Sequence, residues 1–368
     1  MDQFINVSGD LHIERQQYGL PLRFNDNLSC INFIVDDTCQ QANCIGLILT
    51  GDTFNKKTIL PKYQILFKSI YDKLVSAKKE FLAIDGNHDG SDASWLDTVN
   101  PVINVSGKLM PIGDKLAGFY SFQDRPKLYE AIKPAAPKLN FLFLHGRLLE
   151  LLSWAKAQTT PDYDFSAAEL RELGVKNCTV IMGDIHTYGD YYDPIGNNWF
   201  VYPGSTEMSE VSEGNVVSER FGDAYDPQKY FVRLFPQRPL GKNWERIKLP
   251  NRPFLKRVIQ PGEDIEYAIS QVNKWVKEHP QGILALHYPD SIREKIAEFL
   301  AQWKEKLLVF SDIPLSEYVS KPLQEMQERD ILEIAEKELT HPQILILQQV
   351  LENENFADKV KALLDTRL

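Results

Sequence analysis

Eight side chains of kinds that bind metal ions lie in short polar segments of the first two hundred residues. They are Asp10, His12, Asp52, Asn87, His88, His145, Asp184 and His186. A hydrolase with two metal ions needs such ligands around one point, with one carboxylate between the ions and a proton donor for the leaving oxygen. Mixed carboxylate, amide and imidazole ligands suit manganese, iron or zinc better than calcium. The set therefore predicts a two-metal phosphoesterase.

The spacing of these residues favours their convergence. Asp10 and His12 are two residues apart, as are Asp184 and His186, and in an extended segment such side chains point the same way. Glycines at positions 9, 51, 86 and 183 let the backbone turn tightly beside them. A single Gly-Asp or Asp-x-His pair indicates little. Five such clusters in order are more specific, because together they supply metal ligands, a shared carboxylate and a proton donor.

Each cluster follows a short apolar run that indicates a buried strand. These runs are residues 4–8, 45–50, 81–85, 139–144 and 179–182. Helix-length segments separate them: one begins at Pro61, and another begins with the capping box of Ser166 and Glu169 and ends at Gly174. The alternation predicts an α/β sheet covered on both faces, with ligands at the strand ends.

The sequence changes character after Gly204. Strand-like segments at 230–235 and 244–249 close the first domain. A β-α-β-α-β pattern follows, with strands at 257–260, 282–288 and 307–310 and helices at 264–278 and 291–306. This is enough for a small separate domain. From about residue 316 the chain has the apolar spacing of amphipathic helices.

Composition places the chain among cytoplasmic globular proteins. It has no run of about 18 apolar residues and no secretory signal, so we expect no membrane association. The four cysteines follow no metal-binding or disulfide spacing and are expected to be reduced. The net charge is −10, yet residues 229–257 carry nine Lys or Arg and one acid, Glu245. That basic stretch is either a set of solvated strand faces or a surface that contacts DNA phosphates.

Several segments around the clusters resemble SbcD-type nucleases, the bacterial relatives of the meiotic-recombination-eleven family in the calcineurin-like metallophosphoesterase superfamily. The similar segments are residues 9–26, which include Arg15 to Leu20, Arg23 and Asp26; Tyr202-Pro203-Gly204-Ser205; and residues 247–254. The β-α-β-α-β pattern is similar to that family's DNA-capping domain in place and order. The resemblance covers about residues 4–310.

The resemblance implies a ligand set and a mechanism. Asp10, His12, Asp52 and His186 would hold one ion. Asp52, Asn87, His145 and Asp184 would hold the other, with Mn²⁺ as the expected metal at both positions. His88 would protonate the leaving oxygen or stabilise the transition state, with Asp89 orienting it. One position departs from the pattern, because the family usually has Gly-His-x-His where this chain has Asp184 and His186. That departure implies a shift in metal preference or tighter binding of the second ion.

The resemblance also implies an architecture and partners. It predicts a four-layer metallophosphoesterase β-sandwich flanked by helices in residues 1–254, a small α+β capping domain in 255–312 and a helical tail in 313–368. The activity would be manganese-dependent exonuclease cleavage of double-stranded DNA and endonuclease cleavage of single-stranded DNA in repair or recombination. We expect a homodimer that acts with an SbcC-type coiled-coil ABC ATPase in a bacterial cytoplasm, or in a host cytoplasm if the chain is phage-encoded.

Other interpretations stay open at this stage. Tyr18, Lys56, Lys57 and Arg252 are candidate DNA contacts, and Tyr18 is equally suited to a dimer contact. The tail either packs on its own domain or docks on the ATPase coiled coil, because both use the same apolar spacing. The same scaffold also suits a phosphomonoesterase or a small-nucleotide phosphodiesterase. A metal site that only stabilises an assembly would have no need of His88.

Overall fold

The computed structural model describes residues 2–89, 94–123, 125–152, 163–208, 228–259, 262–301 and 306–314. These residues form one sheet of five strands, one of six and one of three. By its contacts the chain divides into two compact units, the first holding residues 1–258, 264–286 and 302–311, the second 259–263, 287–301 and 312–368. Both large sheets, and the site built on them, belong to the first unit.

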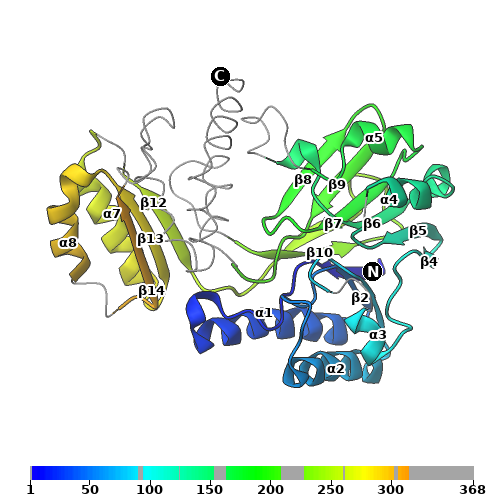
Figure 1. Ribbon diagram of the computed structural model, residues 1–368, viewed down its shortest axis with the longest axis horizontal. Helices are drawn as coiled ribbons and strands as arrows, with labels where there is room; N and C mark the ends of the chain where they lie inside the picture. Colours follow the sequence, from blue (N-terminus) through cyan, green and yellow to red (C-terminus); the bar gives the residue numbers. More distant parts are fainter. Residues whose placement is uncertain are drawn as a thin grey trace, which may run out of the picture. The chain divides into compact units, whose positions relative to one another are not determined.

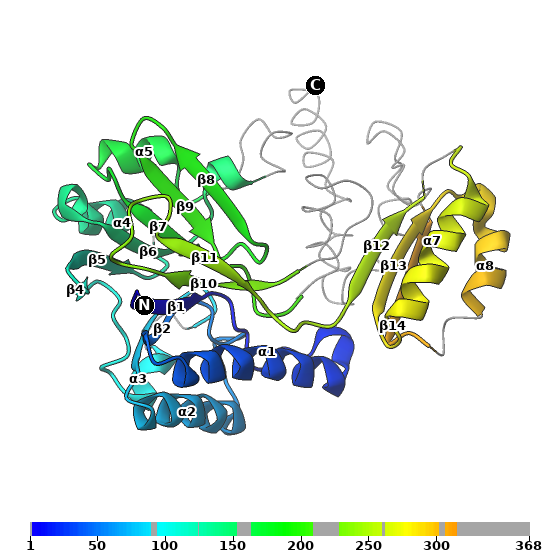
Figure 2. The same cartoon turned by 180° about the vertical axis from the view of Figure 1, so that it is seen from behind.

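The five-stranded sheet carries the N-terminal clusters. Its order is β11 (Trp244–Lys248), β10 (Tyr230–Leu234), β1 (Phe4–Ser8), β2 (Cys44–Thr50), β3 (Glu80–Ile84). Strands β1, β2 and β3 are parallel, while β10 and β11 are antiparallel additions. Its helical elements are η1 (Gln17–Gly19), α1 (Pro21–Gln40), α2 (Pro61–Ser76) and α3 (Trp95–Val99). Figures 1 and 2 show α1 and α2 side by side along one face of this sheet.

The six-stranded sheet carries the remaining clusters. Its order is β4 (Leu109–Ile112), β5 (Lys115–Tyr120), β6 (Phe141–His145), β7 (Thr179–Gly183), β9 (Asn198–Tyr202), β8 (Gly189–Asp193). The four central strands are parallel and the two edge strands antiparallel. Its helical elements are α4 (Arg125–Ile132), η2 (Ala136–Lys138), η3 (Leu149–Leu151) and α5 (Ala167–Glu172).

Three apolar cores hold these layers together. One, with Ile31 and Phe67, lies between α1, α2 and the first sheet. Another, with Leu142 and Leu170, lies between the second sheet and its helices. The third contains Ile5, Val7 and Ile48 of the first sheet together with Phe143, Ile181 and Val201 of the second. The two sheets therefore pack face to face, each with helices on its outer side, and the predicted four-layer β-sandwich is confirmed.

The three-stranded sheet follows the predicted β-α-β-α-β order. Its elements are β12 (Phe254–Val258), α7 (Ile265–Glu278), β13 (Ile283–Tyr288), η5 (Asp290–Ile292), α8 (Arg293–Ala301) and β14 (Val309–Pro314), with strand order β12-β13-β14. The boundaries of a capping domain at 255–312 remain a prediction. The predicted tail at 313–368 lies almost wholly outside the described residues.

Local sequence signals explain where several helices begin. Pro21 and Pro61 each occupy a first helical position. Ser166 accepts a hydrogen bond from the Glu169 backbone N–H at 3.2 Å and donates to the Glu169 carboxylate at 2.8 Å, which is the predicted capping box.

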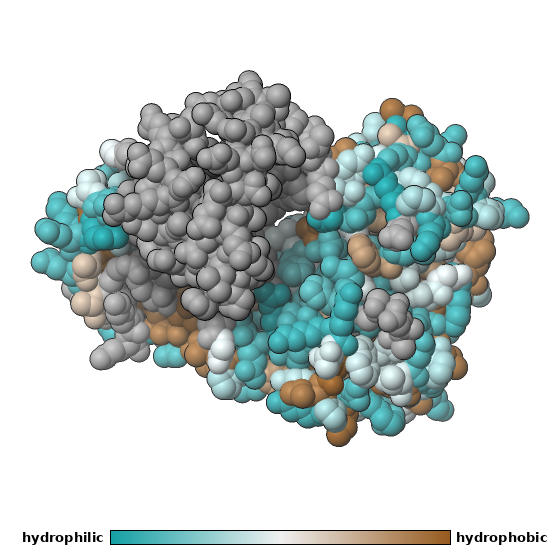
Figure 3. All heavy atoms as spheres, in the orientation of Figure 1, coloured by the Kyte–Doolittle hydropathy of each residue, from teal (hydrophilic) through white to brown (hydrophobic). Residues whose placement is uncertain are grey.

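The described side chains on one face of the molecule are mostly polar. Figure 3 shows a predominantly hydrophilic face with hydrophobic side chains in small scattered groups. Among the residues that the structure describes, no helix combines the length and the apolar character needed to cross a membrane.

Candidate metal centre

The five predicted clusters meet at one edge of the two packed sheets. Asp10 and His12 follow β1, Asp52 follows β2, and Asn87 and His88 follow β3. His145 ends β6, and Asp184 and His186 follow β7. Backbone hydrogen bonds join these loops, from Asp10 N to Gly51 O at 3.2 Å and from Gly146 N to Gly183 O at 3.2 Å. Parallel strands thus bring residues far apart in sequence to a common edge.

Four of the eight residues have left-handed backbone conformations. The φ angles are 47° for Asp10, 43° for His12, 50° for Asp52 and 95° for Asp184. Such angles are costly for residues other than glycine and cluster at functional sites. The expectation that Asp10 and His12 share an extended segment is wrong, because both lie in a turn beyond β1. Their side chains converge through this turn rather than through strand alternation.

Gly51 allows the two sheets to approach each other at the site. Its φ of 98° suits glycine, and a Cβ atom there would collide with Nδ1 of His145. His145 Nδ1 lies 2.8 Å from the Thr50 carbonyl. A carbonyl only accepts, so Nδ1 carries the proton of this bond, and Nε2 faces the cluster.

Asp10, His12 and His186 form one group of potential metal ligands. One ligand atom from each lies within 4.8 Å of the others. Nε2 of His12 is 3.1 Å from Nε2 of His186, and it is 4.0 Å from Oδ2 of Asp52. Two imidazole nitrogens and two carboxylates directed at one point suit a divalent transition-metal ion.

Asp10 also belongs to a second group, with Asp52 and His145. His145 Nε2 lies 3.5 Å from Oδ1 of Asp52 and 3.8 Å from Oδ1 of Asp184. The Asn87 amide oxygen is directed at acceptors alone: it lies 3.2 Å from His145 Nε2, and 3.1 and 3.0 Å from the two Asp52 oxygens. Turning the amide would let its nitrogen donate to Asp52, and in the present orientation a cation would satisfy the facing oxygens. The donor set fits a metal ion well.

Burial and mutual charge set the protonation of the ion-free cluster. Burial raises the pKa of Asp10 to about 7, against the opposing influence of His186. Burial, aided by His186, lowers the pKa of His12 to about 3. Burial would also lower the pKa of His145, but Asp52 outweighs it and raises the pKa to about 10. Asp52 has a pKa well below its usual value because His145 and His12 outweigh its burial. Metal ligands must be deprotonated, so a cation would compete with these protons.

His88 lies beside the Asp52 carboxylate. Its side chain is 44% exposed, and Nε2 is 4.0 Å from Oδ2 of Asp52. Its Nδ1 lies 3.0 Å from the Asn55 carbonyl, which fixes the ring with Nδ1 as donor. The exposed Nε2 edge is thus available to a substrate.

Asp89 has a different task from the predicted one. Its carboxylate accepts from the backbone N–H groups of Thr53 at 3.2 Å, Phe54 at 2.9 Å and Gly86 at 2.8 Å. The prediction that it orients His88 is therefore corrected: the Asn55 carbonyl contacts that ring, whereas Asp89 braces the loops after β2 and β3. Burial and then Asp52 raise the pKa of Asp89 to about 7.

Two side chains that the sequence did not single out support the cluster. Lys229, 3% exposed, donates from Nζ to the His186 carbonyl at 2.8 Å and to Ser205 Oγ at 3.0 Å. Asn27 of α1 donates to the Leu11 carbonyl at 2.8 Å. The sequence indicated Lys229 only as one member of the basic stretch, and it gave no signal for Asn27. Both residues contact partners far away in the sequence, which local patterns do not reveal.

The Tyr202-to-Ser205 segment holds the loops that carry ligands. The Tyr202 hydroxyl accepts from Leu148 N at 2.8 Å and donates to Gly146 O at 2.7 Å. Gly204 has a φ of 84°, and a Cβ there would lie 2.7 Å from the His186 carbonyl. Ser205 N donates to that same carbonyl at 2.9 Å. The segment that marked the resemblance therefore supports both His145 and His186.

The candidate DNA contacts fall into different classes. Lys56 and Lys57 are exposed in the loop after Asp52. Arg252 is committed elsewhere, since its Nε and Nη2 each lie 2.7 Å from a carboxylate oxygen of Asp26. Its assignment to DNA is therefore corrected to a structural ion pair. The side chain of Tyr18 lies outside what the structure describes.

The basic stretch is largely bound within the fold. Arg233 pairs with Asp37, Arg238 pairs with Asp2 and Glu245, and Arg246 lies over the rings of Tyr188 and Tyr230. Lys229, Lys256 and Arg257 are buried. The interpretation of residues 229–257 as a run of phosphate contacts is not supported by this geometry.

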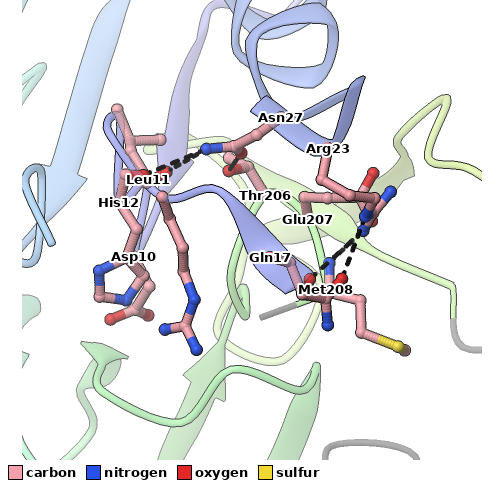
Figure 4. A pocket seen from close by; sticks show the side chains of 10 residues that line it. Asp10, Leu11, His12, Gln17, Arg23, Asn27, Thr206, Glu207 and Met208 are labelled. Carbon is pink, nitrogen blue, oxygen red and sulfur yellow. Dashed lines mark hydrogen bonds and ion pairs between the residues drawn. The ribbon is translucent and has the colours of Figure 1, made fainter. Parts of the chain in front are cut away.

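A pocket opens beside Asp10 and His12, lined in part by Arg15, Gln17 and Glu207 (Figure 4). Arg23, almost fully buried, also lines it: its Nε donates to Gln17 Oε1 at 3.0 Å, and its Nη2 lies 3.2 Å from Glu207 Oε1. The pocket adjoins the cluster on the side of Asp10 and His12.

Comparison with known proteins gives relatives of one kind. DNA double-strand break repair protein Mre11 of Methanosarcina mazei is 24% identical over 309 residues, covering 78% of this chain and 45% of the relative. The protein of the same name from Halobacterium salinarum is 27% identical over 218 residues, covering 56% of this chain and 52% of the relative. The chain spans about half the length of the curated relatives it matches. No protein-family model matches it.

A solved structure, wild-type Vps29 complexed with Zn²⁺ from Entamoeba histolytica, is 16% identical with a TM-score of 0.32, covering 67% of this chain and 99% of its own. That likeness is too low to carry an argument. The chain is thus similar in sequence to two Mre11 proteins, and its ligand-type side chains converge at one edge of a four-layer sandwich.

Proposed function

We propose that the chain is a metal-dependent phosphodiesterase that cleaves DNA in double-strand-break repair or recombination. The observation that carries the proposal is the position of Asp52, whose carboxylate lies between the imidazoles of His12 and His145 with His88 beside it. A nuclease of this kind needs a shared carboxylate and a nearby proton donor. The similarity to two proteins named for DNA double-strand break repair supports DNA as the substrate.

The proposed ligand sets are those that the resemblance implies, and each contains at least two members of one group of neighbouring side chains. Asp10, His12, Asp52 and His186 would hold one ion, and Asp52, Asn87, His145 and Asp184 the other, with Mn²⁺ as the ion that suits such mixed ligands. When bound, the two ions would polarise the phosphoryl oxygens and lower the pKa of water. Asp52 would keep the two sets at a fixed separation.

His88 supplies the proton in this proposal. The Asn55 carbonyl accepts from Nδ1, so a second proton on the ring would reside at the exposed Nε2. From there it can pass to the departing alkoxide of the DNA strand. Asp89 holds the loops after β2 and β3 through its three backbone hydrogen bonds and thereby sets the distance between Asp52 and His88.

The remaining roles are proposed from the resemblance. Lys56 and Lys57 would contact DNA phosphates, since both are exposed in the loop that begins at Asp52. The chain would work as a homodimer with an SbcC-type coiled-coil ATPase in the cytoplasm. Size-exclusion chromatography tests both partners. Elution of the chain as a monomer would count against the homodimer, and failure to co-elute with such an ATPase would count against that partner.

The test is cleavage of labelled linear duplex and single-stranded DNA by the purified chain with Mn²⁺. We expect cleavage that EDTA abolishes. His88→Ala should reduce the rate about 10²- to 10⁴-fold and leave Mn²⁺ binding intact, because general acid catalysis contributes about that factor. His279→Ala, at the end of α7, is the matched control. Faster turnover of a nitrophenyl phosphomonoester than of DNA would favour the alternative phosphomonoesterase.

A further inference from the structure

Arg147 lies next to the one ligand position at which the sequence departs from its family. It follows His145 and Gly146 at the end of β6. Its Nε is 3.7 Å from Oδ2 of Asp184 and 3.3 Å from Oδ2 of Asp164. The side chains of Arg147 and Asp184 are 31% and 18% exposed. The guanidinium is therefore placed beside the carboxylate that replaces the usual imidazole.

The backbone of Arg147 is firmly positioned. The Tyr202 hydroxyl bonds the residues on either side of it, Gly146 and Leu148. Arg147 N donates to Oδ2 of Asp164 at 2.7 Å, and Asp164 N donates to Arg147 O at 3.0 Å. Because these hydrogen bonds fix the backbone at Arg147, they also restrict where its side chain can lie. The fold therefore places the guanidinium near Asp184.

The two oxygens of Asp184 face different partners. Oδ2 is the atom nearest to Arg147, whereas Oδ1 lies 3.8 Å from Nε2 of His145, within the proposed second ligand set. A metal ligand with one oxygen directed to the ion and the other to a cationic neighbour is oriented by that neighbour. Asp184 N also donates to Oδ1 of Asp10 at 3.0 Å, which ties the residue to the first set.

Charge explains why the two residues would occur together. A neutral imidazole at position 184 would add no charge to the second ligand set, whereas the Asp184 carboxylate adds one negative charge. The Arg147 guanidinium adds one positive charge nearby, shared between Asp184 and Asp164, and so offsets part of the negative charge that Asp184 adds. Carboxylate oxygen is also a harder ligand than imidazole nitrogen and suits Mn²⁺ better than Zn²⁺.

We propose that Arg147 and Asp184 act as one charge-compensating unit that replaces a neutral histidine ligand, with Asp184 as the ligand of the second ion and Arg147 as its positioning residue. This inference rests on the proposed two-metal centre but not on DNA as the substrate. If the inference is right, the effect of a substitution at Arg147 on metal affinity must depend on which residue occupies position 184.

The experiment is calorimetric titration of the metal-free full chain with Mn²⁺, without DNA, for a double-mutant cycle. Asp184→His removes the carboxylate that separates the Arg147 charge from the dication, so the second ion should bind about tenfold more weakly. The double variant D184H/R147M should recover most of that affinity. Arg147→Met alone should bind the second ion severalfold more weakly, because Asp184 loses the neighbour that orients it, whereas the charge-preserving Arg147→Lys should stay near the unmodified chain.

Arg147→Met keeps the backbone hydrogen bond to Asp164, and thermal melts of the metal-free chains check that each variant folds. If Asp184→His does not fold, the isosteric Asp184→Asn takes its place, with the same expected weakening and the same rescue by Arg147→Met. Strictly additive effects, or a double variant no better than Asp184→His, would overturn the inference. A chain that binds no Mn²⁺ in any form would instead overturn the two-metal proposal itself.

Discussion

The two proposed ligand sets share Asp52 and differ in what surrounds them. The first set contributes two imidazoles, from His12 and His186, whose Nε2 atoms lie 3.1 Å apart. The second contributes one imidazole, His145, together with carboxylate and amide oxygens, and it has Arg147 beside it. The first set should therefore accept softer ions, and the second should be more selective for ions that prefer oxygen.

Their supports differ as well. The His186 carbonyl accepts from Lys229, a buried cation just before β10, while the His145 loop is fixed by the neutral hydroxyl of Tyr202. A lysine thus supports the backbone of the first set, and an arginine compensates the charge of the second. This difference makes the two sets separable by mutation, except at the carboxylate that they share.

The largest effect is expected at that carboxylate. Asp52→Asn removes the charge that lies between His12 and His145, so both ions should bind weakly and the rate of cleavage should fall by about 10³-fold or more, given the several kcal/mol that bound metal contributes. Mn²⁺ titration and a single-turnover cleavage assay measure this. Loss of one ion alone would break the comparison, because it would show that Asp52 serves a single set.

Lys229→Met should produce the next largest effect, on the first set. It removes two buried hydrogen bonds, to the His186 carbonyl and to Ser205 Oγ, and removal of such support typically weakens metal binding about 10- to 100-fold. Titration with Mn²⁺ should show a weaker first ion and an unchanged second. Lys248→Met, an exposed lysine of β11, is the matched control and should bind both ions normally. Equal weakening of both ions would count against separable supports.

Tyr202→Phe should act on the second set more mildly. It leaves Leu148 N without its acceptor and Gly146 O without its donor, at a cost of about 1–3 kcal/mol in the free energy of unfolding. Urea denaturation measures that cost. Tyr192→Phe, whose exposed hydroxyl bonds Asn197, should change stability far less. Reduced stability with no change in the second ion's affinity would confine Tyr202 to a folding role.

How far the sequence could predict this site depends on the range of the interactions. The strands and their ligand clusters were predictable, because apolar runs and the residues that follow them are local features. The role of Asp89 was not, since its partners at Thr53 and Phe54 lie in a different loop. Arg252 was misassigned for the same reason: Asp26, its partner, is far away in sequence.

The outer two strands at each end of the six-stranded sheet were also beyond the sequence argument. Strands β4 and β5 pair as a hairpin around Gly113, and β8 and β9 join across residues 194–197. No ligand cluster follows any of them, so the pattern that located β1, β2, β3, β6 and β7 could not find them. The left-handed backbones of Asp10 and His12 were equally hidden, because tertiary packing rather than local propensity imposes them.

The smallest effect is expected from residues outside both sets. Lys56→Ala with Lys57→Ala should leave Mn²⁺ affinity and maximal rate unchanged but weaken DNA binding, and should reduce the slope of log affinity against log salt by about one for each phosphate that is no longer neutralised. Lys133→Ala with Lys138→Ala is the matched pair, because Lys138 lies before β6, at the end of that strand opposite to His145. An unchanged salt slope in the first pair would remove these lysines from the DNA interface while leaving both ligand sets as proposed.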